Sequence, residues 1–528
     1  MRAITRVAVA TLAASAMLTA CSSGSSGGKN AKLVSGGTLT IAVAQDPGNL
    51  DPQNSALSVD GTFAAFAYDP LVNQDKTGKM VSGLAQSWTQ SGNTFTFTMH
   101  DAVTCSDGTP LTASTVAANF TYIADPKNKS PLLGQIVPPG LKASGNDTAH
   151  TVTLHLTGPF PFFLIGMTGV PIVCQKGLAD RKLLAQHTDG TGAYVLASAV
   201  SGDTYIYTVR KGYAWGPAGA TTQPTGVPAK LKVRVITNAS TATNLLLAGQ
   251  VNIADVSDAD RQRVEAQHLI HSDLRKPTGE MYFNEAAGRP TADVDVRRAL
   301  VMGLDLTKLG KVLTSGAGHP SQGMVTAEPK PCQGDPVTGN VPAHDPSGAG
   351  ALLDRAGWTM GPNGVRQKGG KPLELNLVYS SPPDTFPSTA ELAVSQWKAI
   401  GVQVKAVQKP ITQISTVLFG TGAFDISWAG LTVNLPSQLV PFLSGATPPN
   451  GTNFAHLHNA DYDRLAAAAA AKPGTTGCAD WNAAETALVK AVDVVPYYDS
   501  VVPTYAKNTT FDAVNGGYVI TSLRLRAG

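Results

Sequence analysis

Residues 81–99 read VSGLAQSWTQSGNTFTFTM, and residues 106–113 read SDGTPLTA. Over the last six residues of the first stretch, Phe and Met alternate with Thr, which is the period of two expected of a half-buried strand. In the second stretch an Asp-Gly pair is typical of a turn, and a Thr stands where a helix over 112–123 needs its N-cap. The segment therefore predicts a strand, a turn and a capped helix.

Similar patterns continue along the chain and indicate an α/β protein. Alternating strands are expected at 38–43, 93–99, 231–235 and 373–377. Helices are expected at 112–123, 241–247, 295–304, 349–356, 390–400, 461–471 and 481–492. Strands and helices mixed in this way are typical of α/β lobes, and the roughly 500 residues after the N-terminal segment suggest two to four domains.

The N-terminal residues have the order of an export signal. Two arginines precede the apolar run 7–18, which is shorter than the roughly 20 residues that a membrane-spanning helix needs, and small residues follow it. Residues 1–20 are therefore expected to be removed. The residues before Cys21 resemble the lipobox of bacterial lipoproteins, which implies a diacylglycerol on Cys21. An ordinary secretory signal with an incidental cysteine is the alternative. The Ser- and Gly-rich stretch that follows predicts a flexible tether over 21–35.

The composition excludes several classes of protein. Of the 528 residues, 43% are hydrophobic and 15% are charged, which is typical of a folded globular protein. A formal charge of +3 is too small for a nucleic-acid-binding surface. Without Cys21 four cysteines remain, an even number that fits disulfides in an exported protein. The residues alone leave three pairings open among Cys105, Cys174, Cys332 and Cys478.

Sequence signatures of catalysis and metal binding are missing. No Gly-x-Ser-x-Gly elbow stands between a strand and a helix, and there is no His-Glu-x-x-His, Walker loop or dinucleotide fingerprint. His456 and His458 alternate in an extended segment without a third ligand, so we predict no metal site and no cofactor. We therefore expect that the protein is not an enzyme. A lipid-anchored extracellular hydrolase and a non-transport surface receptor or chaperone are the alternatives.

The segment 81–113 resembles the extracytoplasmic solute-binding proteins that serve peptide, oligopeptide and nickel ABC importers, bacterial solute-binding protein family 5. Further matches to this family follow in the same order along the chain, at 190–194, 210–215, 247–254, 282–284, 296–300, 303–305, 345–346, 356–358, 424–426 and 453–463. The resemblance covers roughly residues 37–505, and co-linearity over that span argues against chance similarity.

The resemblance implies an α/β fold with two lobes, periplasmic-binding-protein-like of type II. The implied fold is that of the large cluster of these proteins, which have an extra α/β subdomain inserted in lobe I. On this basis lobe I comprises 36–52, 187–277 and 500–528, the inserted subdomain comprises 53–186, and lobe II comprises 278–499.

This partition carries an expectation about the cysteines. A disulfide between lobes would oppose the hinge closure by which such proteins capture ligand. The partition places Cys105 and Cys174 in the inserted subdomain, and Cys332 and Cys478 in lobe II. The resemblance therefore implies the bonds Cys105–Cys174 and Cys332–Cys478. Four buried thiols are the alternative.

Members of this family enclose the ligand between the lobes, and the loop after the Phe-Asp-Ile strand lines the cavity. The matching loop offers Trp428 as a flat apolar wall and Gly430 for a close backbone approach. Thr432 and Asn434 in the same loop are expected to fix polar groups of the ligand. A tryptophan in the core at a strand end is the alternative for Trp428.

One departure from the family concerns charge. Peptide-binding members place an Asp in this loop to pair with the peptide's α-ammonium group, and here Asn434 is nearest by spacing. An amide brings no charge, so a blocked, modified or uncharged ligand is favoured. Family position adds Gln45, Ser58 and Asp60 on lobe I. Asp60 either supplies the missing charge or is a solvated turn residue, of which we favour the second.

The implied function is that of a substrate-binding lipoprotein of an ABC importer. It captures a peptide or peptide-like small solute by hinge closure and delivers it to membrane permease subunits with an associated ATPase. We expect a monomer without nucleic-acid partners. We also expect it to be exported and anchored by its lipid to the outer face of the cell membrane or in the periplasmic space.

Overall fold

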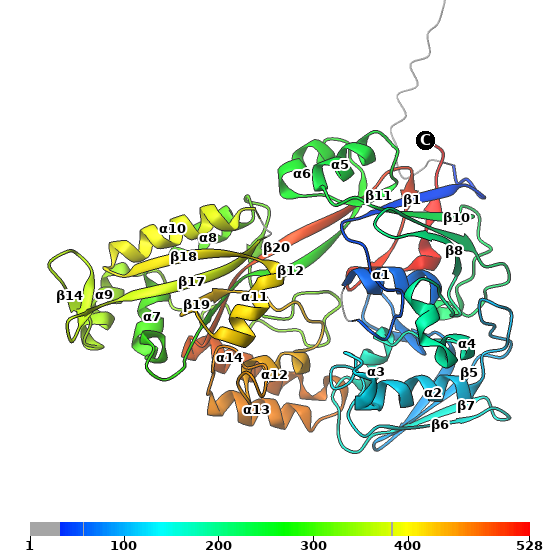
Figure 1. The fold of residues 1–528 in the computed structure, drawn as a ribbon, viewed down its shortest axis with the longest axis horizontal. Coiled ribbons are helices and arrows are strands. Elements are labelled where there is room, and N and C mark those ends of the chain that lie inside the picture. The colour runs from blue at the N-terminus through cyan, green and yellow to red at the C-terminus, as the bar shows by residue number, and fades with distance from the viewer. Residues whose placement is uncertain (1–31, 56–57, 382–383) are drawn as a thin grey trace, which may run out of the picture.

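A computed structural model describes residues 32–55, 58–381 and 384–528. The expectations about Cys21 and the signal segment therefore lie outside the described residues. Two lobes are joined by two long strands, β12 (Ile270–Phe283) and β20 (Val494–Ala506), which pair antiparallel and run from one lobe into the other (Figure 1). Among the helices of the described ranges, none combines the length and the apolar character that crossing a bilayer requires.

One large sheet passes through both lobes. It has 11 strands, ten of them in the order β18-β17-β19-β12-β20-β11-β1-β10-β9-β8, and β13 (His319–Pro320) pairs with β20 beside this path. Since β12 and β20 stand in its middle, the hinge between the lobes consists of hydrogen-bonded sheet.

Lobe I is built on the β11-to-β8 end of this sheet. Its elements are β1 (Thr38–Val43), β8 (Tyr194–Val200), β9 (Thr204–Val209), β10 (Lys230–Val235), β11 (Ile253–Asp255), α5 (Ala239–Leu247) and α6 (Asp258–Glu265). Leu39 and Ile41 of β1 face the main core, whereas Ala42 packs in a second cluster with Leu246 of α5. β1 is thus buried on both faces, where the alternation predicted one, because the main core covers one face and the cluster that contains α5 covers the other.

The inserted subdomain carries its own sheet, in the order β4-β5-β7-β6. Its elements are α1 (Ser58–Ala67), β2 (Val72–Gln74), β3 (Met80–Ser82), β4 (Ala85–Ser91), β5 (Thr94–Met99), α2 (Ala113–Ala124), β6 (Lys142–Asn146), β7 (Thr151–His155), α3 (Phe163–Gly166) and α4 (Gln175–Ala179). The apolar face of β5 is buried, and the Thr112 hydroxyl accepts a hydrogen bond from the Thr115 amide at the start of α2. The strand, turn and capped helix predicted from this segment are confirmed.

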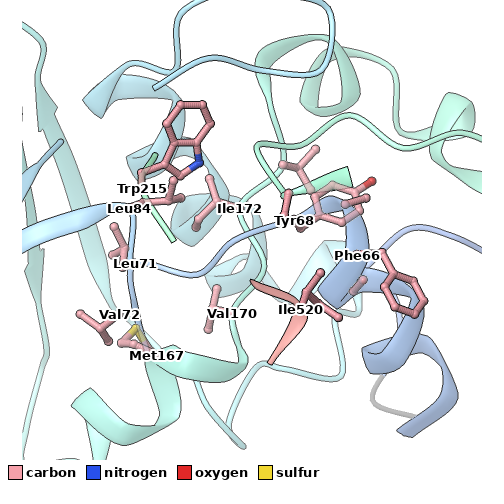
Figure 2. Close-up of a cluster of buried hydrophobic side chains, with 14 of the residues drawn as sticks. Phe66, Tyr68, Leu71, Val72, Leu84, Met167, Val170, Ile172, Trp215 and Ile520 are labelled. Atoms are coloured by element: carbon pink, nitrogen blue, oxygen red, sulfur yellow. The ribbon is translucent and has the colours of Figure 1, made fainter. Parts of the chain in front are cut away.

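The inserted subdomain and lobe I share one apolar core. Figure 2 shows side chains from α1, β2, the segment around Met167 and the chain end near Ile520 gathered in it. At its edge the buried Asp69 carboxylate accepts hydrogen bonds from the Tyr213 hydroxyl, 2.7 Å, and the Trp215 indole, 3.1 Å. Burial raises the pKa of Asp69, and these hydrogen bonds oppose that shift. The motif 210–215 therefore fixes the insert to lobe I.

Lobe II contains the other end of the large sheet, and its helices cover both faces of the sheet. Its elements are α7 (Val294–Met302), α8 (Leu306–Leu313), α9 (Pro346–Arg355), β17 (Glu374–Ser381), α10 (Phe386–Ala399), β18 (Gln403–Pro410), α11 (Ile411–Thr416), β19 (Ile426–Trp428), α12 (Val440–Leu443), α13 (Ala460–Ala470) and α14 (Cys478–Ala491). Helices α7 to α10 pack on one face with Trp397 and Trp428, and α11 to α14 pack on the other with Tyr282 and Phe454.

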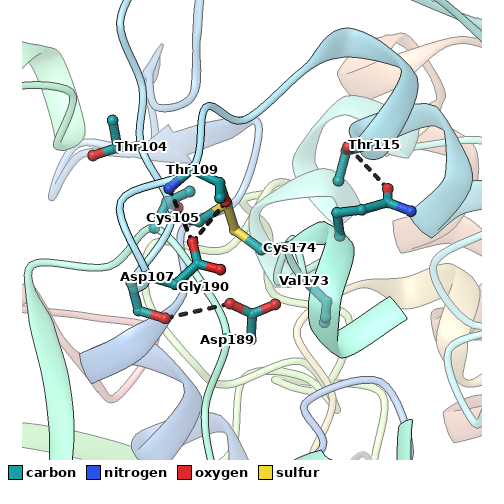
Figure 3. The surroundings of a disulfide bond; sticks show 12 residues. Thr104, Cys105, Asp107, Thr109, Thr115, Val173, Cys174, Asp189 and Gly190 are labelled. Atoms are coloured by element: carbon teal, nitrogen blue, oxygen red, sulfur yellow. Dashed lines mark hydrogen bonds between the residues drawn. A yellow bond between two sulfur atoms is a disulfide. The ribbon is translucent and has the colours of Figure 1, made fainter. Parts of the chain in front are cut away.

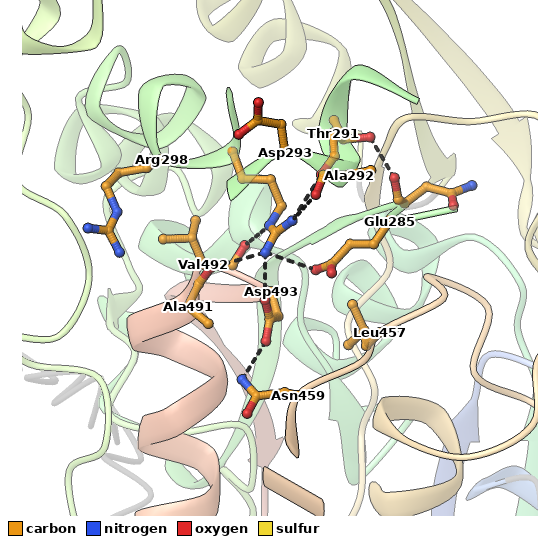
Figure 4. Close-up of polar contacts among 12 residues, drawn as sticks. Glu285, Thr291, Ala292, Asp293, Arg298, Leu457, Asn459, Ala491, Val492 and Asp493 are labelled. Carbon is orange, nitrogen blue, oxygen red and sulfur yellow. Dashed lines mark hydrogen bonds and ion pairs between the residues drawn. The ribbon is translucent and has the colours of Figure 1, made fainter. Parts of the chain in front are cut away.

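A buried ion-pair network fixes the end of β12 to the helices of lobe II (Figure 4). Arg297 of α7 donates to the Asp493 carboxylate at 2.8 Å and to the Val492 carbonyl at 3.0 Å, and its guanidinium lies 3.4 Å from Glu285. Asn459 donates to the other Asp493 oxygen at 2.7 Å. Burial, and after it the negative charge of Asp493, raises the pKa of Glu285. Arg297, which belongs to a motif of the resemblance, is therefore structural.

All seven expected helices are present, with ends within four residues of their predicted positions. The four expected strands are present as β1, β5, β10 and β17. Short strands complete the described fold: β14 (Thr359–Met360), β15 (Arg366–Lys368), β16 (Lys371–Pro372), β21 (Thr509–Thr510), β22 (Ala513–Val514), β23 (Gly517–Tyr518) and β24 (Arg524–Leu525). The long strands β12 and β20 were not predicted.

Both disulfides have the expected pairing, Cys105–Cys174 and Cys332–Cys478. Around the first, the Asp107 carboxylate accepts a hydrogen bond from the Thr109 amide, and the Ser106 hydroxyl donates to Asp189 (Figure 3). Neither bond joins the large-sheet strands of lobe I to those of lobe II, so neither restricts the hinge.

Removing either disulfide is expected to lower the free energy of unfolding by about 2–5 kcal/mol, because each crosslink restricts the unfolded chain. The test compares thermal unfolding of the double variants Cys105→Ser/Cys174→Ser and Cys332→Ser/Cys478→Ser with the wild type. Peptide mapping of unreduced protein should find the same two links. A link between Cys105 and Cys332 would contradict both the pairing and the partition into lobes.

Candidate ligand-binding site

The loop that follows β19 starts beside the hinge. β19 pairs antiparallel with the lobe II end of β12, with Trp428 opposite Met281. Two residues later, a Cβ atom added to Gly430 would stand 1.9 Å from the carbonyl oxygen of Pro277 on β12. The hinge strand itself therefore makes a close backbone approach at Gly430, whereas the approach of a ligand to Gly430 stays a prediction. Only glycine fits this contact.

A buried acid of β12 anchors the same loop by a hydrogen bond. The Glu280 carboxylate accepts a hydrogen bond from the Leu431 amide at 2.9 Å and one from the Tyr282 hydroxyl at 2.8 Å, both on Oε2. Its Oε1 is buried and has no hydrogen-bond partner in the described residues. Burial raises the pKa of Glu280 well above its usual range. The loop is thus anchored to the hinge strand through its main chain.

The far end of the loop is anchored in the same way. The amides of Asn434 and Leu435 both donate to the side-chain oxygen of Gln438, each at 3.2 Å. The side chains of Thr432 and Asn434 remain exposed. With its main chain fixed and these two side chains at the surface, the loop presents polar, uncharged groups.

Trp428 does not belong to this surface. It is fully buried in lobe II, where its ring stacks on Phe386 at 5.8 Å between centroids and lies near Tyr379 and Tyr497. A three-residue strand places it on the face of the sheet opposite Ser427, toward helix α10. Trp428 is therefore a core tryptophan at a strand end, which was the alternative interpretation. The interpretation of Trp428 as a flat apolar wall for the ligand is corrected.

Beyond the hinge from this loop, the candidate residues lie at the end of β1 in lobe I and at the start of α1 in the inserted subdomain. Gln45 is exposed just after β1, and Ser58 is the first residue of α1. Asp60, in the first turn of α1, is only 7% exposed, so it is not the solvated turn residue that we favoured. Burial raises the pKa of Asp60, the negative charge of Asp46 adds to the rise, and a Ser55 hydrogen bond opposes it.

Asp46 is a second acid at this place that the sequence interpretation missed. Its carboxylate accepts hydrogen bonds from the Tyr205 hydroxyl at 2.6 Å and from the Gly48 amide at 2.7 Å. Partial burial alone would raise the pKa of Asp46, but these hydrogen bonds leave it lowered. Its position directly after Gln45 was the available signal.

Two more buried acids lie on the lobe II side of the hinge. Glu485 of α14 accepts a hydrogen bond from the Met324 amide at 2.6 Å, and burial raises the pKa of Glu485 to about 7. Burial raises the pKa of Asp499 on β20 to about 6. Among the described residues no group of three histidines, cysteines or acids is arranged to hold a metal ion.

The family model for bacterial extracellular solute-binding proteins, family 5 Middle, matches residues 79–453. The chain belongs to this family. The periplasmic murein peptide-binding protein MppA of Escherichia coli (strain K12) is 28% identical over 499 residues, which cover 87% of each chain. Relatives of this chain such as MppA are periplasmic binding proteins, which supports export of this chain. Family members bind substrates, so this chain is a solute-binding protein and not an enzyme.

Solved structures show the same fold. The oligopeptide-binding protein AppA of Bacillus subtilis, in complex with a nonapeptide, has a TM-score of 0.75 at 17% identity, over 94% of this chain and 100% of that one. A substrate-binding protein of Microbacterium hydrocarbonoxydans, complexed with 4-hydroxybenzoate hydrazide, has a TM-score of 0.72 at 23% identity, over 92% and 99%. The expected two-lobed, type II periplasmic-binding-protein fold is confirmed.

Gly430→Ala is expected to destabilise the protein by about 1–3 kcal/mol, because the added methyl group overlaps the Pro277 carbonyl and pushes the loop off the hinge strand. Gly420→Ala is the matched control, since its nearest neighbour would be Thr416 Cγ2 at 3.9 Å. Urea unfolding measures both variants. Equal effects would contradict the specific contact at Gly430.

Glu485→Gln should make stability less dependent on pH. The pKa of Glu485 rises from an ordinary 4.5 to about 7 on folding. The folded state therefore holds the proton more tightly, and the stability that protonation contributes is complete below about pH 4.5 and lost as the pH rises to about 7. Above about pH 7, the free energy of unfolding of Glu485→Gln should exceed that of the wild type by about 1–3 kcal/mol.

Urea unfolding between pH 5 and about pH 8 measures this effect. Glu374→Gln replaces an exposed glutamate of β17 and should keep the wild-type pH dependence. An unchanged slope in Glu485→Gln would show that burial of this carboxyl does not govern its titration.

Proposed function

We propose that this protein is the substrate-binding lipoprotein of an ABC importer and captures a peptide or peptide-like small solute between its lobes. The observation that carries the proposal is the anchored loop 429–435 beside the hinge. It presents Thr432 and Asn434 at the surface, while Glu280 and Pro277 fix its main chain to β12. Membership in family 5 and the peptide named for MppA support the ligand class.

Capture depends on contact with both lobes. A ligand shifts a hinge equilibrium only by the difference between its affinities for the two states. Gln45, Ser58 and Asp60 are the proposed contacts on lobe I, and Gly430, Thr432 and Asn434 those on lobe II. The closed complex docks on the permease, and the ATPase drives release into the cell. A lipid on Cys21 keeps the protein at the membrane throughout the cycle.

The charges of the site favour a ligand without a free α-ammonium group at the loop. Asn434 cannot compensate a buried ammonium ion, which is costly to remove from water. Asp60 is the one lobe I candidate with a carboxylate, and its buried Oδ1 has no hydrogen-bond partner among the described residues. If the ligand has a cationic group, we therefore expect that group to lie toward Asp60.

The identity of the ligand is best tested by native mass spectrometry of protein purified without denaturation. The expected result is a co-purified peptide or peptide-like mass that dissociates on unfolding. Small-angle scattering with and without that compound should show compaction on binding. Turnover of the bound compound would contradict a binding function, and binding without any effect of added ligand on scattering would contradict hinge capture.

Asn434→Asp is expected to change the preference between two probes, trialanine and N-acetyl-trialanine. The wild type should bind the acetylated peptide at least as tightly. The added carboxylate should shift the ratio of the two dissociation constants toward free trialanine by about tenfold, because it compensates the ammonium charge. Isothermal titration measures both ratios, and Thr432→Ser serves as the control. A strong wild-type preference for free trialanine would refute the proposed role of Asn434.

A further inference from the structure

A small hollow in lobe II lies at the end of the candidate ligand loop. One wall is the segment 322–336, which follows β13, and the other is the start of α14, with Trp481 and Glu485. Pro436, the residue directly after the loop 429–435, completes the lining. The hollow has a volume of about 20 Å³, which suits a water molecule or the end group of one side chain and not a whole residue.

Both walls of the hollow are fixed in place. The disulfide Cys332–Cys478 joins the segment 322–336 to the first residue of α14. The Met324 amide donates to Oε1 of Glu485 at 2.6 Å, which joins the same two elements a second time. The shape of the hollow therefore does not have to be created by a ligand, so little free energy is lost in ordering it.

The hollow lies where lobe II meets the inserted subdomain. The ring of Phe162, from the inserted subdomain, has its centroid 6.4 Å from that of Trp481. Gln322 in the lining is exposed, so the hollow reaches the protein surface. Since the hollow also borders the loop 429–435, a solute held by that loop can extend one end group into it.

The hollow offers one hydrogen-bond donor and one acceptor. Trp481 is 3% exposed, and its buried indole N–H has no hydrogen-bond partner among the described residues. An unpaired buried N–H costs free energy, so a ligand atom that accepts from it gains affinity. Glu485 supplies the acceptor, because the Met324 amide bonds to its Oε1 and not to its Oε2.

The charges around the hollow disfavour an ionic ligand. Lys330 is part of the lining and repels a cation, and a cation offers no acceptor to the Trp481 N–H. An anion would lie beside the carboxyl group of Glu485. Burial raises the pKa of Glu485 to about 7, so this carboxyl is not a strong fixed charge near neutral pH. The hollow therefore favours a neutral group that both accepts and donates hydrogen bonds.

The spacing of the two side chains favours a carboxamide over a hydroxyl group. Trp481 and Glu485 stand four residues apart on α14, so they are neighbours on one face of the helix. A carboxamide carries its acceptor and its donors on two different atoms, whereas a hydroxyl group carries them on one. The oxygen and the nitrogen of a carboxamide can therefore serve the two side chains separately.

We propose that this hollow is a subsite for a primary carboxamide, such as an Asn or Gln side chain or an amidated end of the captured solute. The carboxamide oxygen accepts from the Trp481 indole, and its nitrogen donates to Glu485. The inference rests on the proposed capture of a peptide-like solute for the source of the amide, and it adds a neutral polar end group to that ligand class.

The first test observes Trp481 and needs no peptide. The wild type is labelled with 5-fluorotryptophan, and the Trp481 resonance in fluorine NMR is assigned with Trp481→Phe. The labelled protein is titrated at constant ionic strength with acetamide, acetate, methylammonium and ethanol. Acetamide should shift the Trp481 resonance saturably, with a dissociation constant of about 1–10 mM. The other three compounds should bind at least about tenfold more weakly, because each leaves one of the two side chains unpaired or less well paired.

Gly323→Ala fills the hollow. A Cβ atom added to Gly323 would lie 3.1 Å from Oε1 of Glu485 and 3.6 Å from Cγ of Pro336, between residues of the lining. The variant should bind acetamide at least about tenfold more weakly. Gly158→Ala is the matched control, since its Cβ would meet no atom of the described residues within 4 Å. If Gly323→Ala does not fold, the four compounds on the wild type still decide the proposal.

The second test connects the hollow to the captured solute. The probes are N-acetyl-trialanine with Gln at each of its three positions in turn, and the same three peptides with Met, which has a similar length without an amide. Isothermal titration should find one Gln peptide that binds the wild type about tenfold more tightly than its Met counterpart. This preference should disappear in Gly323→Ala and persist in Gly158→Ala.

Three results would overturn the carboxamide subsite. The first is an acetamide response no larger than that of ethanol, which would leave the hollow to water. The second is an acetamide response that persists in folded Gly323→Ala. The third is peptide binding without any preference for Gln. A saturable acetamide response without binding of any peptide would support the carboxamide site and contradict the proposed ligand class instead.

Discussion

The antiparallel pairing of β12 with β20 is the constraint on which the rest of the molecule depends. These strands belong to the sheet of both lobes, so each lobe is completed by residues that also form the hinge. The ladder is interrupted between Lys276 and Glu280, where the register shifts twice. A bulge bends a strand and increases its twist, which makes this interruption the natural place for the lobes to move. The proposed boundary at 277/278 falls within it.

The same interruption couples the hinge to the candidate ligand loop. Pro277 contacts Gly430 through its carbonyl oxygen, and Glu280 accepts a hydrogen bond from Leu431. A bend at the bulge therefore moves the loop with the hinge strand. Burying a carboxyl group is costly, but without Glu280 the Leu431 amide and the Tyr282 hydroxyl would lose the partner that each now has. The cost of burying Glu280 is therefore offset because its carboxylate holds the ligand loop by the main chain.

Much of the fold could be predicted because local patterns and family motifs agree with it. Strands such as β5 and helices such as α2 follow from alternation and capping alone. The hinge strands could not be predicted in this way, because β12 contains Lys276-Pro277-Thr278-Gly279, residues that usually mark a turn. In addition, β12 is partly exposed in lobe I but buried on both faces from Gly279 onward, so a single alternating pattern does not cover it. Tertiary pairing with β20 overrides this local signal.

The candidate site was predicted less well, for the same physical reason. Trp428 and Asp60 occupy the segments that the family implies, but their burial depends on which face of a strand or helix meets the rest of the lobe. Glu280 was missed although the sequence shows it as the one charged residue of the last six in β12, directly before Met281-Tyr282-Phe283. Contacts between distant segments decide such cases, and no periodicity reports them.

The hinge strands have a direct consequence for capture. They can bend at the two register shifts while they stay paired on either side of them. A ligand that contacts both lobes favours the closed state by the difference between its affinities for the two states. A loop with polar but uncharged side chains suits such a ligand, because its selectivity for the part that lies at lobe II then rests on shape and hydrogen bonding, while the one charged candidate, Asp60, lies beyond the hinge in the inserted subdomain.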